Sequence, residues 1–485
     1  MSNLIVEAGP GSGKTTTLTK THNYLLTGQI IGNVSPEQYV IMESARQMFP
    51  KITPNDACFV CMTTSGRDDI ASKLLTETKV FTYNALGLSL LSRWKKFQQY
   101  DPKRGEKIIE SLTGRRLEDL PWKQRLVYYN CLKFIRCLKE ELLYPTPENV
   151  FYVQDKYGID APPPENIEEM DRIMKRMMHL DGTVEYIDQV WGVVANYKTT
   201  APYKIIYVDE CQDLSMLKLL LIVKSAQNIF FCGDPFQSIN GFAGACYNVF
   251  ERLLKMSQKH LPLKTCFRCP PNRIERANSI RPARIVAHKT EVVPDKVIPI
   301  DDLGDYLKSI TIVPEEHMMI ARLNNILLRV GIKLLLQGIQ CHVMTRHSEG
   351  NSINEIVLAY IKSSRAATLK ELVLFANNDI SAAENKNFNV NTYVVERANC
   401  ILELAQGLTT IRQVVERIQR LTDEQPHSIP LCTIHKSKGL ESKNIYILYP
   451  PVQLNCDNHN QAEQEINLEF VSETRSSHQT IYVVE

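Results

Sequence analysis

Three short runs of apolar residues stand out in the chain, at residues 4–6 (LIV), 205–208 (IIYV) and 229–232 (IFFC). None shows the polar alternation of a half-exposed strand, and each ends in glycine or acidic residues. This pattern predicts buried strands of a parallel sheet, which helices cover on both faces. The carboxyl ends of parallel strands meet at one edge of the sheet, so we expect an α/β protein with its ligand site there.

The first run leads into AGPGSGKTT, which has the G-x-x-x-x-G-K-T spacing of a phosphate-binding loop with Ala8 at the position of the first glycine. Glycines let successive backbone N–H groups point at phosphate oxygens, and the following helix adds its positive N-terminal end. Within the loop, Lys14 would bridge two phosphates and Thr15 would bind Mg²⁺. A plain glycine turn is the alternative, which the match at Gly13, Lys14 and Thr15 between a strand and a helix disfavours. The predicted nucleotide-binding residues are Gly9, Pro10, Gly11, Ser12, Gly13, Lys14, Thr15 and Thr16.

The second run ends in the acidic sequence DECQD at residues 209–213. Here we expect Asp209 to hold Mg²⁺ and Glu210 to act as the general base that polarises the attacking water. An acidic turn after a core strand is the alternative. Together with the phosphate loop, the pair predicts a nucleoside triphosphate hydrolase.

The third run continues into GDPFQSINGFAGA at residues 233–245. In the order AGPGSGKT, DECQD and GDPFQSINGFAGA, the chain resembles motifs I, II and III of superfamily 1A helicases, the UvrD/Rep family. Further segments resemble the later motifs in the family's order. They are residues 61–67 (CMTTSGR), 81–87 (FTYNALG), 263–270 (LKTCFRCP), 320–325 (IARLNN), 433–441 (TIHKSKGLE) and 467–475 (NLEFVSETR).

The resemblance implies two RecA-like motor domains of parallel sheets flanked by helices, with helical insertions and an ATP site between the domains. It implies that Gln237 senses the γ-phosphate and that Arg268 and Arg475 are arginine fingers from the second motor domain. Glu441 resembles the carboxylate that binds the ribose hydroxyl, and Gly439 lets the backbone approach the nucleotide. The catalytic set is then Lys14, Glu210, Gln237, Arg268 and Arg475, with ATP and Mg²⁺ as cofactors.

The resemblance also implies a partner, single-stranded DNA or a 3′-tailed duplex, and movement from 3′ to 5′. The residues at DNA-contacting positions are Thr63, Thr82, Asn84, Phe242 and His435.

The chain also departs from the family pattern. Asn240 and Ala243 replace the usual Tyr and Arg, and Met62 replaces a Phe, so we expect weaker contacts to the DNA bases than is typical of the family. The adenine-recognising glutamine that usually precedes the phosphate loop is not seen, which leaves base selectivity open.

The motif order predicts how the domains divide. The first motor domain takes residues 1–94 and 200–260, and the second takes 261–346 and 426–485. Helical periodicity between the two parts of the first domain, with a break at prolines 162–164, predicts a helical insertion at 95–199. Residues 347–425 are expected to form a reduced version of the family's second insertion.

The composition of the chain limits the number of domains and the cellular setting but does not indicate a function. The 485 residues suit two or more domains, and the net charge of +2 does not indicate a nucleic-acid partner, so any DNA surface must be basic locally. An odd number of cysteines, 13, and the start of the chain in a strand predict a cytosolic or similarly reducing setting. The pairs Cys58/Cys61 and Cys266/Cys269 have zinc-like spacing, but core packing is the favoured interpretation.

Five arginines between residues 268 and 284 leave three interpretations open: a nucleic-acid channel, salt bridges to Glu275 and other acids, or a solvated face.

Two classes of function remain. The first is an ATP-driven helicase or translocase. The second is a DNA-stimulated ATPase subunit of a nuclease or other DNA-processing or defence complex, without unwinding of its own.

Overall fold

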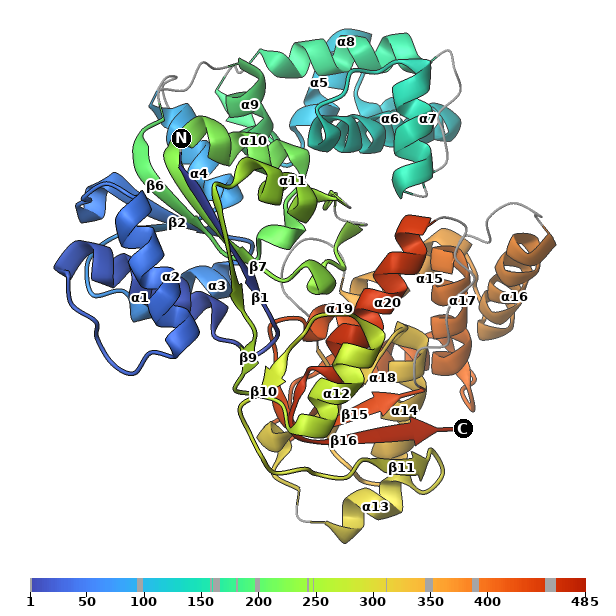
Figure 1. Ribbon diagram of the computed structural model, residues 1–485. Helices are drawn as coiled ribbons and strands as arrows, with labels where there is room; N and C mark the ends of the chain where they lie inside the picture. The colour runs from blue at the N-terminus through green and yellow to red at the C-terminus, as the bar shows by residue number, and fades with distance from the viewer. Residues whose placement is uncertain are drawn as a thin grey trace. The chain divides into compact units, whose positions relative to one another are not determined.

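The protein divides into two compact units, Met1–Lys264 and Thr265–Glu485, each built around a parallel sheet (Figure 1). We describe each unit by itself, from a computed structural model. The described residues are 2–93, 99–157, 159, 166–179, 182–196, 201–241, 244–246, 248–310, 312–344, 352–385, 392–449 and 459–485.

The first unit contains a six-stranded sheet in which all pairings are parallel. The predicted strands form its centre and lie next to one another, with Leu4 of one opposite Phe230 of the next. Their carboxyl ends therefore meet at one edge, as expected. The strand order is β3 (Lys79–Thr82), β2 (Ala57–Cys61), β6 (Tyr203–Val208), β7 (Ala226–Gly233), β1 (Asn3–Ala8) and β8 (Lys259–Leu263).

Apolar side chains on both faces of this sheet explain why the strands read as continuous hydrophobic runs. Phe59, Tyr207 and Phe230 pack in the core under α1 (Lys14–Thr27) and α2 (Pro36–Met48). On the opposite face, their sequence neighbours join a second core with residues of α4 (Tyr83–Ser92) and α10 (Met216–Ser225). Helix α3 (Thr64–Lys73) follows β2, and α11 (Val249–Met256) precedes β8.

Among its described residues, the segment predicted as a helical insertion contains five α-helices and a two-stranded ribbon that the sequence did not predict. The ribbon pairs β4 (Gln99–Tyr100) with β5 (Thr183–Val184). Inside the insertion, Asp188 is buried between Arg104 and Lys139 at 2.7 and 2.6 Å. The helices are α5 (Arg104–Thr113), α6 (Trp122–Glu141), α7 (Pro147–Tyr157), α8 (Ile167–Met178) and α9 (Asp188–Asn196).

The second unit has its own six-stranded, fully parallel sheet. Two short strands, β9 (Thr265–Cys266) and β10 (Val286–Ala287), pair outside it. The sheet order is β11 (Lys296–Pro299), β16 (Ser476–Val484), β15 (Ser442–Leu448), β12 (His317–Ala321), β14 (Ile429–Thr433) and β13 (Cys341–Val343). Its flanking helices include α12 (Pro271–Ile280), α13 (Leu303–Ser309), α14 (Asn324–Leu336), α19 (Ile434–Ser437) and α20 (His459–Glu473).

In the described part of the region predicted as a reduced second insertion, the helices are α15 (Ile353–Ser364), α16 (Leu369–Asn385), α17 (Thr392–Ala405) and α18 (Ile411–Thr422). Their buried side chains, such as Val357, Ile401 and Val414, belong to the same core as Leu431 and Tyr446 of the second sheet. This region is therefore part of the core of the second unit rather than a separate lobe.

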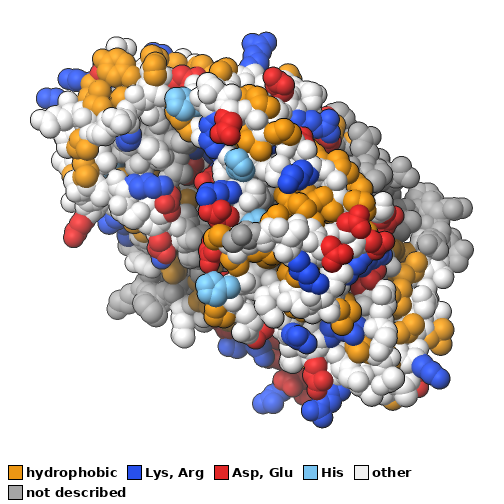
Figure 2. All heavy atoms as spheres, turned by 90° about the horizontal axis from the view of Figure 1, so that it is seen from below, with side chains coloured by type: hydrophobic (Ala, Val, Ile, Leu, Met, Phe, Trp, Pro, Cys, Tyr) orange, Lys and Arg blue, Asp and Glu red, His pale blue; other side chains and the backbone are white. Residues whose placement is uncertain are grey.

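The predicted fold class, two α/β domains with helix-covered parallel sheets, is confirmed by the two sheets. Among the described residues, no helix combines the length and apolar character that crossing a membrane requires. Basic and acidic side chains are interspersed on the face shown in Figure 2, which agrees with the small net charge.

Candidate nucleotide and nucleic-acid site

The phosphate loop joins β1 to α1, and its glycines adopt the backbone that the motif requires. Gly11 and Gly13 have φ of 62° and 83°, in the left-handed region that favours glycine. Ser12 Oγ donates to the Gly9 carbonyl at 2.7 Å, and the Gly9 N–H donates to the carbonyl of Leu263 at 2.9 Å. With Pro10 held between Gly9 and Gly11, the loop is a fixed turn at the N-terminus of α1, which suits a phosphate group.

Side chains of α1 contact the acidic end of β6. Thr15 Oγ1 donates to Asp209 Oδ2 at 2.7 Å, and Lys14 Nζ lies 3.6 Å from Glu210 Oε1. Thr16 lies in the same first turn of the helix. Glu210 has a left-handed backbone with φ of 52°, which is uncommon for a residue other than glycine and costs free energy. Such strain is typical of functional sites.

Around Lys14 the carboxylates outnumber the positive charges. Burial, and then the charge of Glu210, raise the pKa of Asp209 to about 6. Burial alone would lower the pKa of Lys14, but Glu210, Asp234 and Asp209 together raise it above its usual value. Lys14 therefore stays protonated while three carboxylates compete for its charge. A cation next to Asp209 would relieve this excess of negative charge.

The loop after β7 is tied to the loop after β6 through amide side chains. Gln237 Nε2 donates to Asp234 Oδ2 at 2.7 Å, and the Asp234 N–H donates to Gln212 Oε1 at 3.0 Å. Gln212 in turn donates to Glu210. Asp234 and Gln212 were not among the predicted site residues, although the motifs that contain them were recognised.

These residues fit Mg²⁺ and a triphosphate. A threonine hydroxyl and a carboxylate are the hard oxygen ligands that Mg²⁺ prefers, and they already lie within hydrogen-bonding distance of one another. Asp209 is buried with a raised pKa, as expected for a carboxylate whose counter-charge comes from a ligand. Thr15 and Asp209 would hold the ion, and the loop from Gly9 to Thr16 would hold the phosphates.

The predicted DNA-contacting residues of the first unit lie at the same sheet edge, after β2 and β3. Thr63 and Thr82 are helix N-caps: their hydroxyls accept from the N–H groups of Gly66 at 3.1 Å and Ala85 at 3.3 Å. Asn84 donates to the carbonyl of Tyr186 at 2.6 Å. Phe242, the predicted stacking residue, lies outside the described residues.

The predicted residues of the second unit lie on both sides of its sheet: His435 follows the carboxyl end of β14, and Gly439 and Glu441 precede the amino end of β15. His435 lies in α19, where burial and the positive charges of Arg322 and Lys438 lower its pKa to about 3, so it is neutral. Gly439 has a φ of 83°, as expected for a position that favours glycine. Glu441 forms an ion pair with Arg268.

The two predicted arginine fingers lie beside the same residue of the second unit, Thr474. Arg268 Nη1 donates to the carbonyl of Thr474 at 3.2 Å, next to Arg475 in the chain. Arg475 is buried and donates to the carbonyls of Val471 at 2.9 Å and Leu440 at 3.3 Å. Arg268, Glu441 and Arg475 therefore lie together.

The arginines of residues 268–284 include three that pair with acidic residues distant in sequence, as the salt-bridge interpretation expects, although Glu275 is not among their partners. Arg273 pairs with Glu473 and Asp295, Arg276 with Glu469, and Arg281 with Glu463. The cysteines of the two zinc-like pairs are all buried, and Cys58 and Cys61 belong to the hydrophobic cores of the first unit, as core packing predicts.

A phosphate loop between a strand and a helix, with carboxylates at the end of a neighbouring parallel strand, defines a P-loop NTPase fold. The family model of the UvrD/REP helicase N-terminal domain matches residues 1–258, which is more than half of the chain. The chain therefore belongs to the UvrD/Rep helicase family, and the predicted resemblance is confirmed.

No curated protein sequence matches the chain. Solved structures that resemble it remotely include Arterivirus nonstructural protein 10, a helicase, at 11% identity and a TM-score of 0.33, covering 100% of this chain and 59% of that one. The PRRSV helicase gives 11% and 0.32, covering 99% and 52%. A complex of the Arterivirus protein with DNA gives 12% and 0.33, covering 100% and 61%. The chain thus spans between half and two thirds of the length of these helicases.

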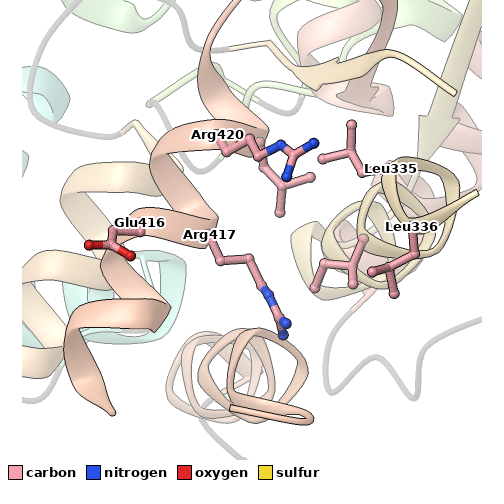
Figure 3. A pocket seen from close by; sticks show the side chains of 7 residues that line it. Leu335, Leu336, Glu416, Arg417 and Arg420 are labelled. Carbon is pink, nitrogen blue, oxygen red and sulfur yellow. The ribbon is translucent and has the colours of Figure 1, made fainter. Parts of the chain in front are cut away.

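A separate pocket of about 230 Å³ lies in the second unit between α14 and α18. Leu335 and Leu336 form its apolar wall, and Arg417 and Arg420 extend toward it from α18 (Figure 3). Arg417 already donates to the carbonyls of Leu404 and Gln406 at 2.9 and 2.7 Å. The pocket contains none of the predicted site residues.

Proposed function

We propose that this protein is an ATP-driven motor that moves 3′ to 5′ along single-stranded DNA and uses Mg²⁺. The observation that carries the proposal is the cluster at the carboxyl ends of β1, β6 and β7, where Lys14 and Thr15 contact Glu210 and Asp209. A loop for phosphates, a protonated lysine, a buried carboxylate and a half-buried carboxylate are the parts that phosphoryl transfer to water requires.

Each side chain has a separate task in this proposal. Glu210 accepts the proton of the attacking water, and its bond from Gln212 orients its carboxylate. Lys14 neutralises charge that develops on the phosphate oxygens. Mg²⁺, when bound by Thr15 and Asp209, would supply further positive charge to the phosphates. Gln237, joined to the cluster through Asp234, would report the state of the nucleotide to the loop that contains Phe242.

The second unit would supply Arg268 and Arg475 to the phosphoryl group that is transferred to water. Glu441 would bind the ribose, next to Gly439. Thr63, Thr82, Asn84, Phe242 and His435 would contact the DNA strand, since backbone contacts and stacking are independent of sequence and suit a translocating motor.

The second candidate is a DNA-stimulated ATPase subunit of a larger complex, such as one with a nuclease, that does not unwind alone. The departures at Met62, Asn240 and Ala243 favour it, because they remove aromatic and cationic DNA contacts. Both candidates share the same ATP site and differ only in whether hydrolysis by the isolated chain separates strands.

The test combines ATP hydrolysis, with and without single-stranded DNA, and strand displacement on duplexes with a 3′ or a 5′ tail. Glu210→Gln should keep nucleotide affinity and lower turnover by about 10² to 10⁴, the contribution of a general base. Glu416→Gln on α18, an exposed acid outside the cluster, is the matched control and should retain full turnover. Equal turnover in Glu210→Gln would refute its role. Stimulation by DNA without displacement would select the second candidate.

A further inference from the structure

Two helices of the second unit lie next to the predicted arginine fingers in the sequence. Helix α12 begins at Pro271, three residues after Arg268, and α20 ends at Glu473, two residues before Arg475. The two helices pack against each other beside β16 (Figure 1). Interactions that hold α12 against the end of α20 therefore also hold in place the backbone next to Arg268 and Arg475.

A buried network of charged and polar groups joins the two helices at that point. Arg273 Nη1 donates to Glu473 Oε2 at 2.6 Å and to the hydroxyl of Tyr482 at 2.8 Å. The Tyr482 hydroxyl donates to the same carboxylate at 2.8 and 2.9 Å. The side chains of Arg273 and Glu473 are each only 3% exposed. Asp295 pairs with the other end of the Arg273 guanidinium.

Burial makes this arrangement rigid. When one partner of a buried ion pair is removed, the other is left as an uncompensated charge, so the two groups hold each other in place. An arginine that donates to a carboxylate, a tyrosine oxygen and a second carboxylate also has its plane fixed, which a lysine would not provide. Arg276, whose Nε is 3.7 Å from Glu473 Oε1, adds a further cation at the rim.

The network leads directly to the predicted fingers. Thr474 follows Glu473, and its carbonyl accepts from Arg268 Nη1 at 3.2 Å and from the Cys269 thiol at 3.6 Å. The next residue is Arg475, whose Nη1 donates to the Leu440 carbonyl at 3.3 Å. A shift of Glu473 would therefore move the acceptor of Arg268 and the backbone of Arg475 together.

We infer that Arg273 is a positioning residue: through its buried pair with Glu473 it holds Arg268 and Arg475 in one fixed arrangement for ATP hydrolysis. The inference rests on the proposed function, because it assigns the task of the network from the role of the two fingers. Arg273 itself does not touch the nucleotide in this mechanism.

A purely stabilising role is the competing explanation, and a double variant separates the two. Arg273→Met and Glu473→Met should each lower the urea midpoint of unfolding, whereas the combined variant should regain it, because an apolar pair can replace a buried ion pair without loss of stability. If the network positions the fingers, kcat for ATP should fall by about 10- to 100-fold in all three variants. The KM for ATP should stay nearly constant, since the phosphate loop is untouched.

Arg281→Met is the matched control. Arg281 pairs with Glu463 at 2.8 Å and so also links the end of α12 to α20, but far along the helix from Glu473. Its loss should leave kcat unchanged. A double variant whose kcat returns to that of the wild-type protein would overturn the positioning role while leaving the proposed function intact. A wild-type protein without DNA-stimulated ATP hydrolysis would instead refute the proposed function, and the inference with it.

Discussion

Asp209 is a charged group in surroundings that disfavour its charge. Its carboxylate is buried beside Glu210, and the hydrogen bond from Thr15 and the charge of Lys14 offset only part of that cost. The result is a pKa of about 6 in the folded protein, compared with an ordinary value of 3.8. Between these two values the folded state binds the proton more tightly than the unfolded state, so stability falls as the pH rises from about 4 to about 6.

Asp209→Asn should therefore stabilise the protein at about pH 7.5 in the absence of divalent cations. A pKa difference of about two units corresponds to about 2 to 3 kcal/mol. The gain should vanish below about pH 4, where the Asp209 carboxyl group is neutral in both the folded and the unfolded wild-type protein. Urea unfolding at the two pH values measures this difference. The exposed Asp69, paired with Lys73 on α3, gives a control in Asp69→Asn. Equal stability of the wild-type protein and the Asp209→Asn variant at the higher pH would contradict the prediction.

How far single residues could be predicted depended on how local their partners are. The phosphate-loop spacing and the acidic end of a strand were readable because each motif is contiguous, and the structure brings Lys14, Thr15, Asp209 and Glu210 together. Their catalytic roles remain predictions. The partners of Arg273 were not readable, because Glu473 is 200 residues away and the choice of acid depends on how α12 meets α20.

At the scale of elements, the apolar runs predicted the strands but not their order. Parallel strands need crossover connections, and the lengths of those connections do not specify which strand becomes the neighbour. In the structure β1 lies between β7 and β8, although 217 residues separate the end of β1 at Ala8 from the start of β7 at Ala226. The ribbon of β4 and β5 was missed because two-residue strands leave no periodic signal.

Helices α4 and α9 illustrate a contact that sequence periodicity cannot show. A Cβ atom on Gly87 of α4 would lie 2.2 Å from the carbonyl oxygen of Gln189, so the two backbones approach more closely than any side chain allows. This approach holds the insertion against the helix that begins just after Thr82.

Gly87→Ala should lower the free energy of unfolding of the first unit by about 1 to 3 kcal/mol, because the helices must separate to admit the methyl group. The expected loss is opposite in sign to the gain of about 1 kcal/mol that alanine brings to an exposed helix position. Urea unfolding followed by circular dichroism gives the measurement. Ser92→Ala, at the exposed end of the same helix, should change stability little. A Gly87→Ala protein as stable as wild type would show that α9 is free to shift.

At the scale of the whole molecule, each unit has a core of its own. Each hydrophobic cluster among the described residues is drawn from one unit: two from residues before Lys264 and one from residues after Thr265. The proposed chemistry divides differently, since the phosphate loop and general base lie in the first unit while Arg268 and Arg475 lie in the second. Folding and nucleotide binding should therefore be separable from hydrolysis.

A fragment of residues 1–264 should fold and still bind a fluorescent ATP analogue, since Lys14, Thr15, Asp209 and Glu210 are all present, but less tightly than the full chain because Glu441 is absent. Its hydrolysis should be slower by about 10³ or more, because an arginine supplied to the transition state contributes 10³ to 10⁵ in turnover. Binding by fluorescence anisotropy and turnover by phosphate release give the two measurements. The full chain with Arg268→Ala and Arg475→Ala is the control for truncation and should show the same pattern of retained binding and lost turnover. A fragment that hydrolyses ATP as fast as the full chain would show that the second unit contributes nothing to the reaction.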